Sequence, residues 1–220
     1  MTALGVTVLV VAKAPVPGLA KTRLAASIGD EAAADLAAAA LLDTLDAVAS
    51  APVERRVVAM TGDLGRASRS AEIQRRLGEF TVIPQRGGDF ADRLANAHAD
   101  AYTGDPVLQI GMDTPQVTAN LLTACSRTLV ESDAVLGPAA DGGWWVLGVS
   151  RPSLAECLRA VPMSRSDTGA LTLAALRGNG IRVDIVERLA DFDTVDDVDG
   201  VRGSCAPESR FAVAAEAVLA

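Results

Sequence analysis

Short apolar runs alternate along the chain with longer segments in which apolar residues recur every three or four positions. The short runs are rich in β-branched residues and are bounded by glycine, proline or charged residues, which is typical of buried strands. They predict strands at residues 6–12, 56–61, 80–84, 106–111, 133–138, 144–149 and 181–187.

The intervening segments have the period of helices that cover a sheet. The first long one follows Asp30, a candidate N-cap, and places Leu41, Leu45 and Val48 on one face. Further helices are predicted at 65–77, 90–102, 118–131, 153–160, 168–178 and 207–218. Strands that alternate with helices predict an α/β fold with a mostly parallel sheet. No repeat, linker or low-complexity tract divides the 220 residues, so we expect a single domain over 1–220.

The composition narrows the class of partner. A net charge of -8 argues against nucleic acid and against an anionic membrane, which are usually held by basic surfaces, so a small molecule is expected. The 3 cysteines are odd in number and widely spaced, which predicts neither a disulfide framework nor a zinc site and fits a reducing compartment. The apolar segment 6–12 is too short to span a membrane and lacks the flanks of a signal peptide. We therefore expect a cytoplasmic protein, and the sequence leaves its oligomeric state open.

The loop after the first predicted strand, AKAPVPGLAKTRLA at 12–25, gathers the first cations of an acidic chain. Lys13, Lys21 and Arg23 all precede the first carboxylate, and the two lysines are the only ones among the 20 basic residues. This placement indicates that the loop requires the compact ammonium of lysine rather than a guanidinium. Gly18 permits close backbone approach, and a helix beginning near Lys21 would add its N-terminal amides, so the loop predicts a phosphate site. A solvated turn with ordinary surface cations is the alternative.

Two acidic segments follow later strands. Asp113, in GMDTP, comes directly after a predicted buried strand, where an unpaired carboxylate is costly unless it caps a helix or binds a cation. Thr114, Pro115 and Thr118 could supply the helix start, which leaves Asp113 for a metal. The late segment DFDTVDD clusters carboxylates, whose oxygens suit Mg²⁺ or Mn²⁺ as well as a solvated acidic turn. They are Asp191, Asp193, Asp196 and Asp197.

The segment DGGWW at 141–145 contains both tryptophans of a chain that is only 3% aromatic. Adjacent strand residues point to opposite faces, so we expect one ring in the core and the other facing a ligand, with core packing of both as the alternative. The lone histidine, His98, has no second histidine for a metal pair, and we assign it no catalytic role.

Taken in order, KAPVPGLAKTRL, QRGGDFADRL, GMDTP, GPAADGGWW and DFDTVDD resemble segments of the GT-A superfamily of nucleotide-diphospho-sugar transferases and their nucleotidyltransferase relatives. The resemblance is strongest to the arsenosugar-biosynthesis-type glycosyltransferases, and AKTRL is also similar to the 2-phospho-lactate guanylyltransferases. It implies a single-domain three-layer GT-A (Rossmann-like) fold with a mostly parallel mixed sheet. Two departures stand out: Val195 replaces the proline of a DxDTPED segment, and Trp144 and Trp145 replace paired tyrosines.

The resemblance also assigns roles to residues. It implies that a nucleotide is bound by Lys13, Pro15, Gly18, Lys21, Arg23, Gly87, Gly88, Asp89 and Arg93. It implies that Mg²⁺ or Mn²⁺ is bound by Asp113 and Asp193, and that the sugar or acceptor is bordered by Asp141, Gly142, Gly143 and Trp144. Lys21 and Asp141 are the catalytic candidates, with Asp141 positioned to orient or deprotonate an acceptor hydroxyl.

The expected activity is metal-dependent glycosyl transfer from a nucleotide-diphospho-sugar to a small-molecule acceptor. The nearest alternative is nucleotidyl transfer, in which an NTP gives its NMP to a phosphorylated small molecule. A non-catalytic nucleotide sensor is a third interpretation, but such a protein would have little reason to keep both aspartates of the metal-binding type. DGGWW suits a sugar or a hydroxylated acceptor, and no basic residue lies between Arg127 and Arg151 to receive a phosphorylated one. The sequence therefore favours glycosyl transfer.

Overall fold

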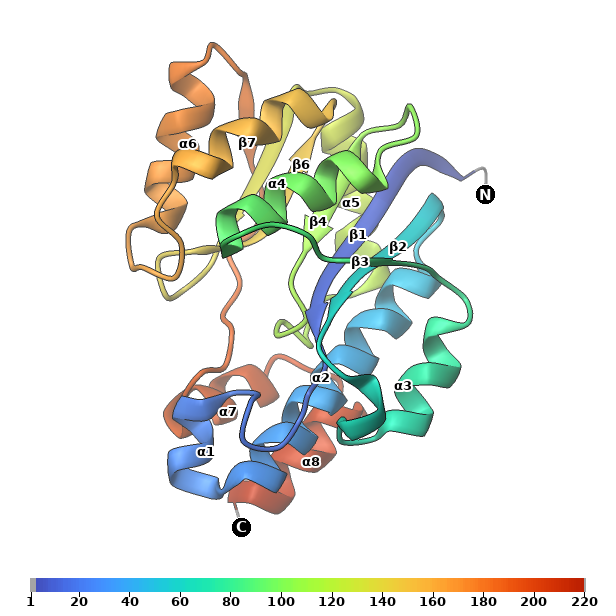
Figure 1. Cartoon of the computed structure of the whole chain (residues 1–220), viewed down its shortest axis with the longest axis vertical. Coiled ribbons are helices and arrows are strands. Elements are labelled where there is room, and N and C mark those ends of the chain that lie inside the picture. Colours follow the sequence, from blue (N-terminus) through green and yellow to red (C-terminus); the bar gives the residue numbers. More distant parts are fainter. Residues whose placement is uncertain (1–2, 220) are drawn as a thin grey trace.

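A seven-stranded sheet runs through the middle of the molecule (Figure 1). The computed structural model describes residues 3–219. The strands follow the order β3-β2-β1-β4-β6-β5-β7, and among them β6 alone runs antiparallel to its neighbours. They are β1 Leu4–Lys13, β2 Val53–Thr61, β3 Thr81–Pro84, β4 Val107–Ile110, β5 Ala134–Pro138, β6 Trp144–Val149 and β7 Val183–Ile185. Every strand predicted from the sequence is confirmed, although β7 is shorter than predicted.

Strand β1 lies near the centre of the sheet because it is apolar on both faces. Val8 and Val10 pack into the core on one side of the sheet, and Leu9 and Val11 pack into the core on the other. A continuous apolar run of this kind is typical of a parallel strand that is covered by helices on both faces.

Helices cover both faces of the sheet and produce three layers. On one face lie α2 Asp30–Ser50, α3 Ser70–Leu77 and α5 Ala119–Val130. On the other lie α4 Phe90–Ala101, the 3₁₀ helix η2 Pro152–Ala160 and α6 Thr168–Gly178. The predicted three-layer α/β arrangement with a mostly parallel mixed sheet is therefore confirmed. No helix within residues 3–219 combines the length and the apolar character that crossing a bilayer requires.

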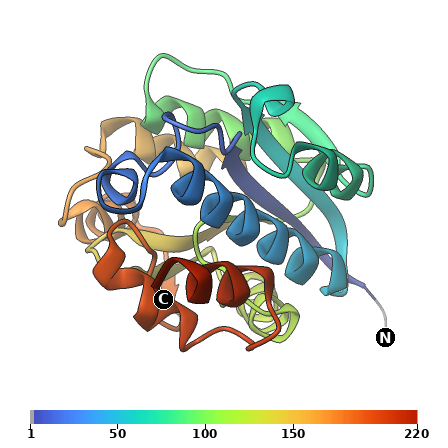
Figure 2. The same cartoon turned by 90° about the horizontal axis from the view of Figure 1, so that it is seen from below.

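A further group of helices packs on the outer side of α2. They are α1 Thr22–Ile28, α7 Val195–Arg202 and α8 Arg210–Leu219. Figure 2 shows α8 running beside α2. Asp43 of α2 accepts hydrogen bonds from the backbone N–H of Arg210 (3.2 Å) and of Phe211 (2.8 Å), so it caps the start of α8. Since α2 is buried on two sides, its small alanines pack against both the sheet and α8.

Three helix predictions are corrected in detail. Gly29 is the N-cap of α2, so Asp30 is its first helical residue and its side chain caps nothing. The predicted helix 65–77 is interrupted at Arg69, whose φ of 50° separates the short 3₁₀ helix η1 Leu64–Arg66 from α3. The last helix begins at Arg210, three residues later than 207 in the sequence prediction.

Helix α7 is absent from the predicted elements. It begins after Thr194, and a reciprocal capping box joins Thr194 to Asp197. Asp197 Oδ2 accepts the Thr194 N–H at 2.8 Å and the Thr194 hydroxyl at 2.7 Å. The acidic residues of this segment, which the sequence suggested as metal ligands, therefore differ in role, and Asp197 caps the start of α7.

Candidate functional site

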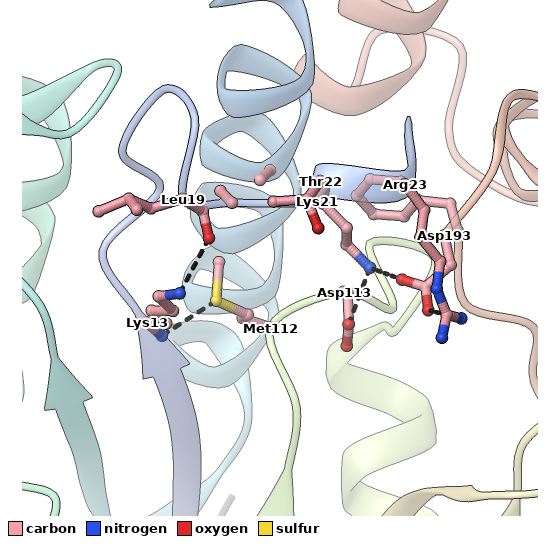
Figure 3. Close-up of a pocket in the computed structure, with 11 residues that line it drawn as sticks. Lys13, Leu19, Lys21, Thr22, Arg23, Met112, Asp113 and Asp193 are labelled. Atoms are coloured by element: carbon pink, nitrogen blue, oxygen red, sulfur yellow. Dashed lines mark hydrogen bonds and ion pairs between the residues drawn. The ribbon is translucent and has the colours of Figure 1, made fainter. Parts of the chain in front are cut away.

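The candidate site lies at the edge of the sheet where the parallel strands end, the usual ligand position in open α/β sheets. The loop that follows β1 carries Lys21, the loop that follows β4 carries Asp113, and the segment after β7 carries Asp193. Figure 3 shows these three side chains meeting although they come from distant parts of the chain. The resemblance predicts Asp113 and Asp193 as a metal-binding pair. In the structure the Lys21 ammonium lies between their two carboxylates.

Lys21 is fixed from several sides. Its backbone is left-handed (φ 45°, ψ 49°), and it directly precedes α1. Its Nζ donates hydrogen bonds to Asp113 Oδ2 at 3.0 Å and to Asp193 Oδ1 at 2.7 Å, with 11% of the side chain exposed. The ammonium also lies 4.4 Å from the centre of the Phe192 ring, a cation–π contact. Phe192 in turn packs on Phe211 of α8, with ring centres 4.6 Å apart, so the outer helical group helps to position the lysine.

The charge of Lys21 follows from its surroundings. Burial lowers the pKa of the Lys21 ammonium, but the charges of Asp113 and Asp193 and the hydrogen bonds to them raise it by more. The pKa therefore lies above its ordinary value, and Lys21 is positively charged at neutral pH.

A third carboxylate joins the two that the sequence paired. One oxygen each of Asp113, Asp191 and Asp193 lies within 4.8 Å of the others. Burial, followed by the negative charges of Asp141 and Asp113, raises the pKa of Asp191 to about 6. The signal for Asp191 was present in the sequence, because alternate residues of an extended D-F-D segment point the same way. Phe192 points into the core instead, where it is 0% exposed.

The three carboxylates fit a divalent ion. Mg²⁺ and Mn²⁺ prefer oxygen ligands, and carboxylates supply both the oxygens and the charge. In the structure the positive charge among these oxygens is the Lys21 ammonium, bonded to Asp113 and Asp193. The position therefore accommodates a small cation in contact with at least two of the carboxylates.

A cavity of about 320 Å³ opens beside this cluster. Its lining residues include Lys13, Leu19, Lys21, Arg23, Met112, Asp113, Phe192 and Asp193. Lys13 Nζ donates to the carbonyl of Leu19 at 2.9 Å, and the Lys13 N–H donates to Met112 Sδ at 3.2 Å. Arg23 is 77% exposed and comes within 3.9 Å of Asp193. The three early cations thus line one cavity.

Pro15 and Gly18 shape the loop without lining the cavity. The carbonyl of Pro15 accepts the Ser68 N–H at 2.9 Å, which ties the loop to the segment before α3. Gly18 has a φ of 76°, which glycine adopts without strain. Their observed role is to direct the chain from Lys13 to Lys21.

The remaining residues that the resemblance assigns to the nucleotide lie at the same sheet edge, after β3, and outside the lining of this cavity: Gly87, Gly88, Asp89 and Arg93. Gly87 has a φ of 144°, and an added Cβ would come 2.7 Å from Asp92. Asp89 is the N-cap of α4 and accepts the Asp92 N–H at 2.8 Å. Gly87 and Asp89 therefore shape the turn and the start of α4. Gly88 lies between them in the same turn, and Arg93 lies in the first turn of α4.

The turn between β5 and β6 brings Asp141 to the acidic cluster. Asp141 Oδ1 accepts the Gly143 N–H at 2.8 Å, and its charge is the second-largest cause of the raised pKa of Asp191. Gly142 has a φ of 93°, and an added Cβ would lie 1.8 Å from the carbonyl oxygen of Ser166. The glycines therefore allow the segment before α6 to pack directly on this turn.

The two tryptophans take different positions. Trp145 is 3% exposed and donates its indole N–H to the carbonyl of Glu187 at 2.7 Å. Trp144 is only partly buried, and it packs against the core on the face that α4 covers. Trp145 is thus the core residue, and Trp144 is the ring nearer to solvent.

One inference from the sequence is corrected by the fold. No basic residue lies between Arg127 and Arg151 in the sequence, but Arg188 donates to the carbonyl of Ala140 at 3.1 Å, directly beside Asp141. Spacing along the chain could not show this, because the contact requires the segment after β7 to lie alongside the segment after β5.

The other residues considered in the sequence analysis lie away from the lining of this cavity. Thr118 caps α5 by accepting the Leu121 N–H at 3.1 Å, so the predicted helix start does not use Asp113, whose carboxylate accepts from Lys21 instead. His98 is 0% exposed on α4. Cys125, Cys157 and Cys205 are free thiols in the structure.

The seven-stranded, mostly parallel mixed sheet with helices on both faces is the fold of the nucleotide-diphospho-sugar transferases. The chain belongs to the family described as uncharacterized protein conserved in bacteria (DUF2064), whose sequence profile matches residues 44–165. A comparison with curated proteins found no match.

Solved structures support the fold. A candidate nucleotide-diphospho-sugar transferase from Desulfovibrio desulfuricans G20 is 26% identical, with a TM-score of 0.82 and coverage of 98% of this chain and 95% of that chain. A CMP:2-keto-3-deoxy-manno-octonic acid synthetase complexed with CTP is 12% identical, with a TM-score of 0.58 and coverage of 90% and 97%. Rv0371c from Mycobacterium tuberculosis H37Rv, in complex with manganese, is 17% identical, with a TM-score of 0.55 and coverage of 89% and 97%. At these identities the last two show the fold alone.

Proposed function

We propose that this protein is a transferase that binds a nucleotide by its phosphates in the cavity at the carboxyl edge of the sheet. The observation that carries the proposal is the convergence of Lys21, Asp113 and Asp193, from three separate loops, on one cavity of about 320 Å³. Similarity of fold to a synthetase solved with CTP and to a protein solved with manganese supports a nucleotide and a divalent ion as ligands.

Asp113, Asp191 and Asp193 would hold Mg²⁺ or Mn²⁺ in this proposal, because their oxygens form the compact donor set that such ions take. When bound, the ion neutralises charge on the nucleotide phosphates and on the leaving group. Lys21 and Lys13 contribute charge-assisted hydrogen bonds to phosphate oxygens from the cavity wall. Arg23, being mostly exposed, adds a weaker, screened attraction.

Glycosyl transfer from a nucleotide-diphospho-sugar to a small-molecule acceptor is the favoured reaction. Asp141 is exposed at the turn beside the acidic cluster, where its carboxylate could orient an acceptor hydroxyl or take its proton. Trp144 offers a partly exposed indole next to this turn, and aromatic faces suit the apolar side of a sugar ring. The description of the Desulfovibrio neighbour supports this class, and membership of the arsenosugar-biosynthesis type stays a prediction.

Nucleotidyl transfer is the second candidate, and one observation favours it. The Arg188 guanidinium lies against Ala140, one residue from Asp141, so the acceptor side has a cation that the sequence spacing concealed. A guanidinium at this position could receive the phosphate of a phosphorylated acceptor.

The bond that breaks distinguishes the two reactions. The full chain is incubated with Mn²⁺, an acceptor extract and either nucleotide-sugars or NTPs, and NDP and pyrophosphate are assayed separately. NDP release from a nucleotide-sugar, lost in Asp113→Asn, supports glycosyl transfer. Pyrophosphate release from an NTP, without NDP from any nucleotide-sugar, overturns it in favour of nucleotidyl transfer.

A further inference from the structure

The Lys21 ammonium lies among the same carboxylates that fit a divalent ion. Its Nζ is 3.0 Å from Asp113 Oδ2 and 2.7 Å from Asp193 Oδ1, and both aspartates belong to the acidic cluster. Mg²⁺ binds its oxygens at ~2.0–2.1 Å, so an ion held by these two carboxylates would come into near contact with the ammonium. Two cations that close repel one another strongly where little water screens them.

The other nearby cations are poor competitors for this position. Arg23 reaches only the far oxygen of Asp193, at 3.9 Å, and is 77% exposed. Lys13 is directed to the Leu19 carbonyl instead. Lys21 is therefore the cation whose removal would most change the cluster.

We infer that Lys21 and the divalent ion are alternative occupants of the Asp113–Asp191–Asp193 cluster, so that metal and nucleotide bind interdependently. This inference rests on the proposed function. Phosphate oxygens that enter the cavity offer the ammonium a new partner, because Lys21 already lines that cavity. Withdrawal of Lys21 then leaves the carboxylates to the ion.

Two consequences follow from this exchange. Without nucleotide, the metal must displace an ammonium held by two hydrogen bonds, so metal alone binds weakly. With nucleotide, the ammonium has moved to the phosphates, and the affinity for metal rises. By thermodynamic reciprocity the metal raises the affinity for nucleotide by the same factor, typically ~5–150-fold.

The test measures binding of Mn²⁺ alone to the full chain by electron paramagnetic resonance of the free ion. Lys21→Gly removes the ammonium and suits the left-handed backbone at this position. We expect this variant to bind Mn²⁺ at least about tenfold more tightly than the wild type, within the range of such couplings. Arg23→Ala is the matched control, since it removes one positive charge at the rim, and we expect a change below about threefold because exposed charges are screened.

Further variants make the outcome decisive. Adding Asp191→Asn to Lys21→Gly should abolish the tight binding, which places the ion in the cluster. Lys21→Met keeps the side-chain stem over Phe192 without the charge, and it replaces the glycine variant if circular dichroism shows that the latter is unfolded. Wild-type binding as tight as that of the variants, and sensitive to Asp191→Asn, would overturn the exchange and leave the metal site standing. Absence of Mn²⁺ binding in all folded variants would overturn both.

Discussion

At Lys21 a left-handed backbone, burial and two carboxylate partners meet in one residue. Arg23, two positions later, shares its sign of charge but is 77% exposed. The sequence placed both residues in a phosphate-binding loop and favoured Lys21 as the catalytic one, but it could not show the burial and the partners of either, because these depend on the loops that follow β4 and β7. The two cations are therefore expected to contribute unequally to binding.

Alanine at Lys21 should weaken the binding of a nucleoside diphosphate, measured by calorimetry in saturating Mn²⁺, by ~1.5–3 kcal/mol, the range for hydrogen bonds to charged groups. Alanine at Arg23 should cost less than about 1 kcal/mol, because an exposed ion pair is screened. A larger loss at Arg23 than at Lys21 would contradict the geometry.

His98 provides a pH-dependent prediction at the same scale. Burial lowers the pKa of His98 to about 3, so the folded chain keeps the imidazole neutral while the unfolded chain takes up a proton near its ordinary pKa of 6.5. The unfolded state binds more protons between these values, and stability therefore falls as the pH is lowered below 6.5.

His98→Leu should remove this part of the pH dependence. Between about pH 7.5 and pH 5.5 the wild type should lose roughly 1 kcal/mol more unfolding free energy than the variant, measured by urea denaturation. The raised pKa of Asp191 acts in the opposite direction in both proteins, so the comparison cancels it. If the unfolding free energies of the two proteins changed equally with pH, His98 would not be the cause of this pH dependence.

At the scale of elements, the turn between β5 and β6 depends on the segment that packs against it. Gly169 donates its N–H to the carbonyl of Gly142 at 2.8 Å, which joins the first turn of α6 to this turn. Gly142→Ala would add a Cβ 1.8 Å from Ser166 at a φ of 93°. We expect it to cost at least about 2 kcal/mol in thermal unfolding, since backbone strain and overpacking add.

Gly178→Ala is the matched control for that substitution. An added Cβ there meets nothing within 4 Å, and the residue ends α6. It should be neutral or stabilise by up to about 1 kcal/mol through helix propensity. Equal unfolding temperatures for the two variants would exclude the proposed packing of the β5–β6 turn on the segment before α6.

The sequence predicted every strand because apolar β-branched runs bounded by breakers carry their own signal. It missed α7 because that helix is polar on most of its surface, with Val198 and Val201 as its buried residues. It misplaced the start of α2 by one residue, because Gly29 satisfies the helix start without a side-chain cap. Local patterns identified the elements, while contacts between distant segments determined their ends.

The site is a property of the whole chain. Its residues come from 21, 113 and 191–193, and the family profile at 44–165 contains only one of these positions. The resemblance to the GT-A superfamily paired Asp113 and Asp193, and the position of both after predicted strands agreed with that pairing. Arg188 could not be assigned there, since its contact with Ala140 arises only when the segments after β5 and β7 lie side by side. Asp191 was one of several clustered acids in the sequence, and the fold distinguishes it by placing it beside Asp113 and Asp193.

The central claim is that this edge of the sheet binds a nucleotide together with a divalent ion. The most direct measurement is a thermal-shift screen of nucleoside diphosphates, triphosphates and nucleotide-sugars, with and without Mn²⁺, on the wild type and on Asp193→Asn. At 100 times its Kd a ligand adds roughly 2.7 kcal/mol of stability. We expect at least one nucleotide to raise the wild-type Tm only with Mn²⁺, and Asp193→Asn to lose that rise. No shift with any nucleotide, or the same shift in Asp193→Asn, would contradict the claim.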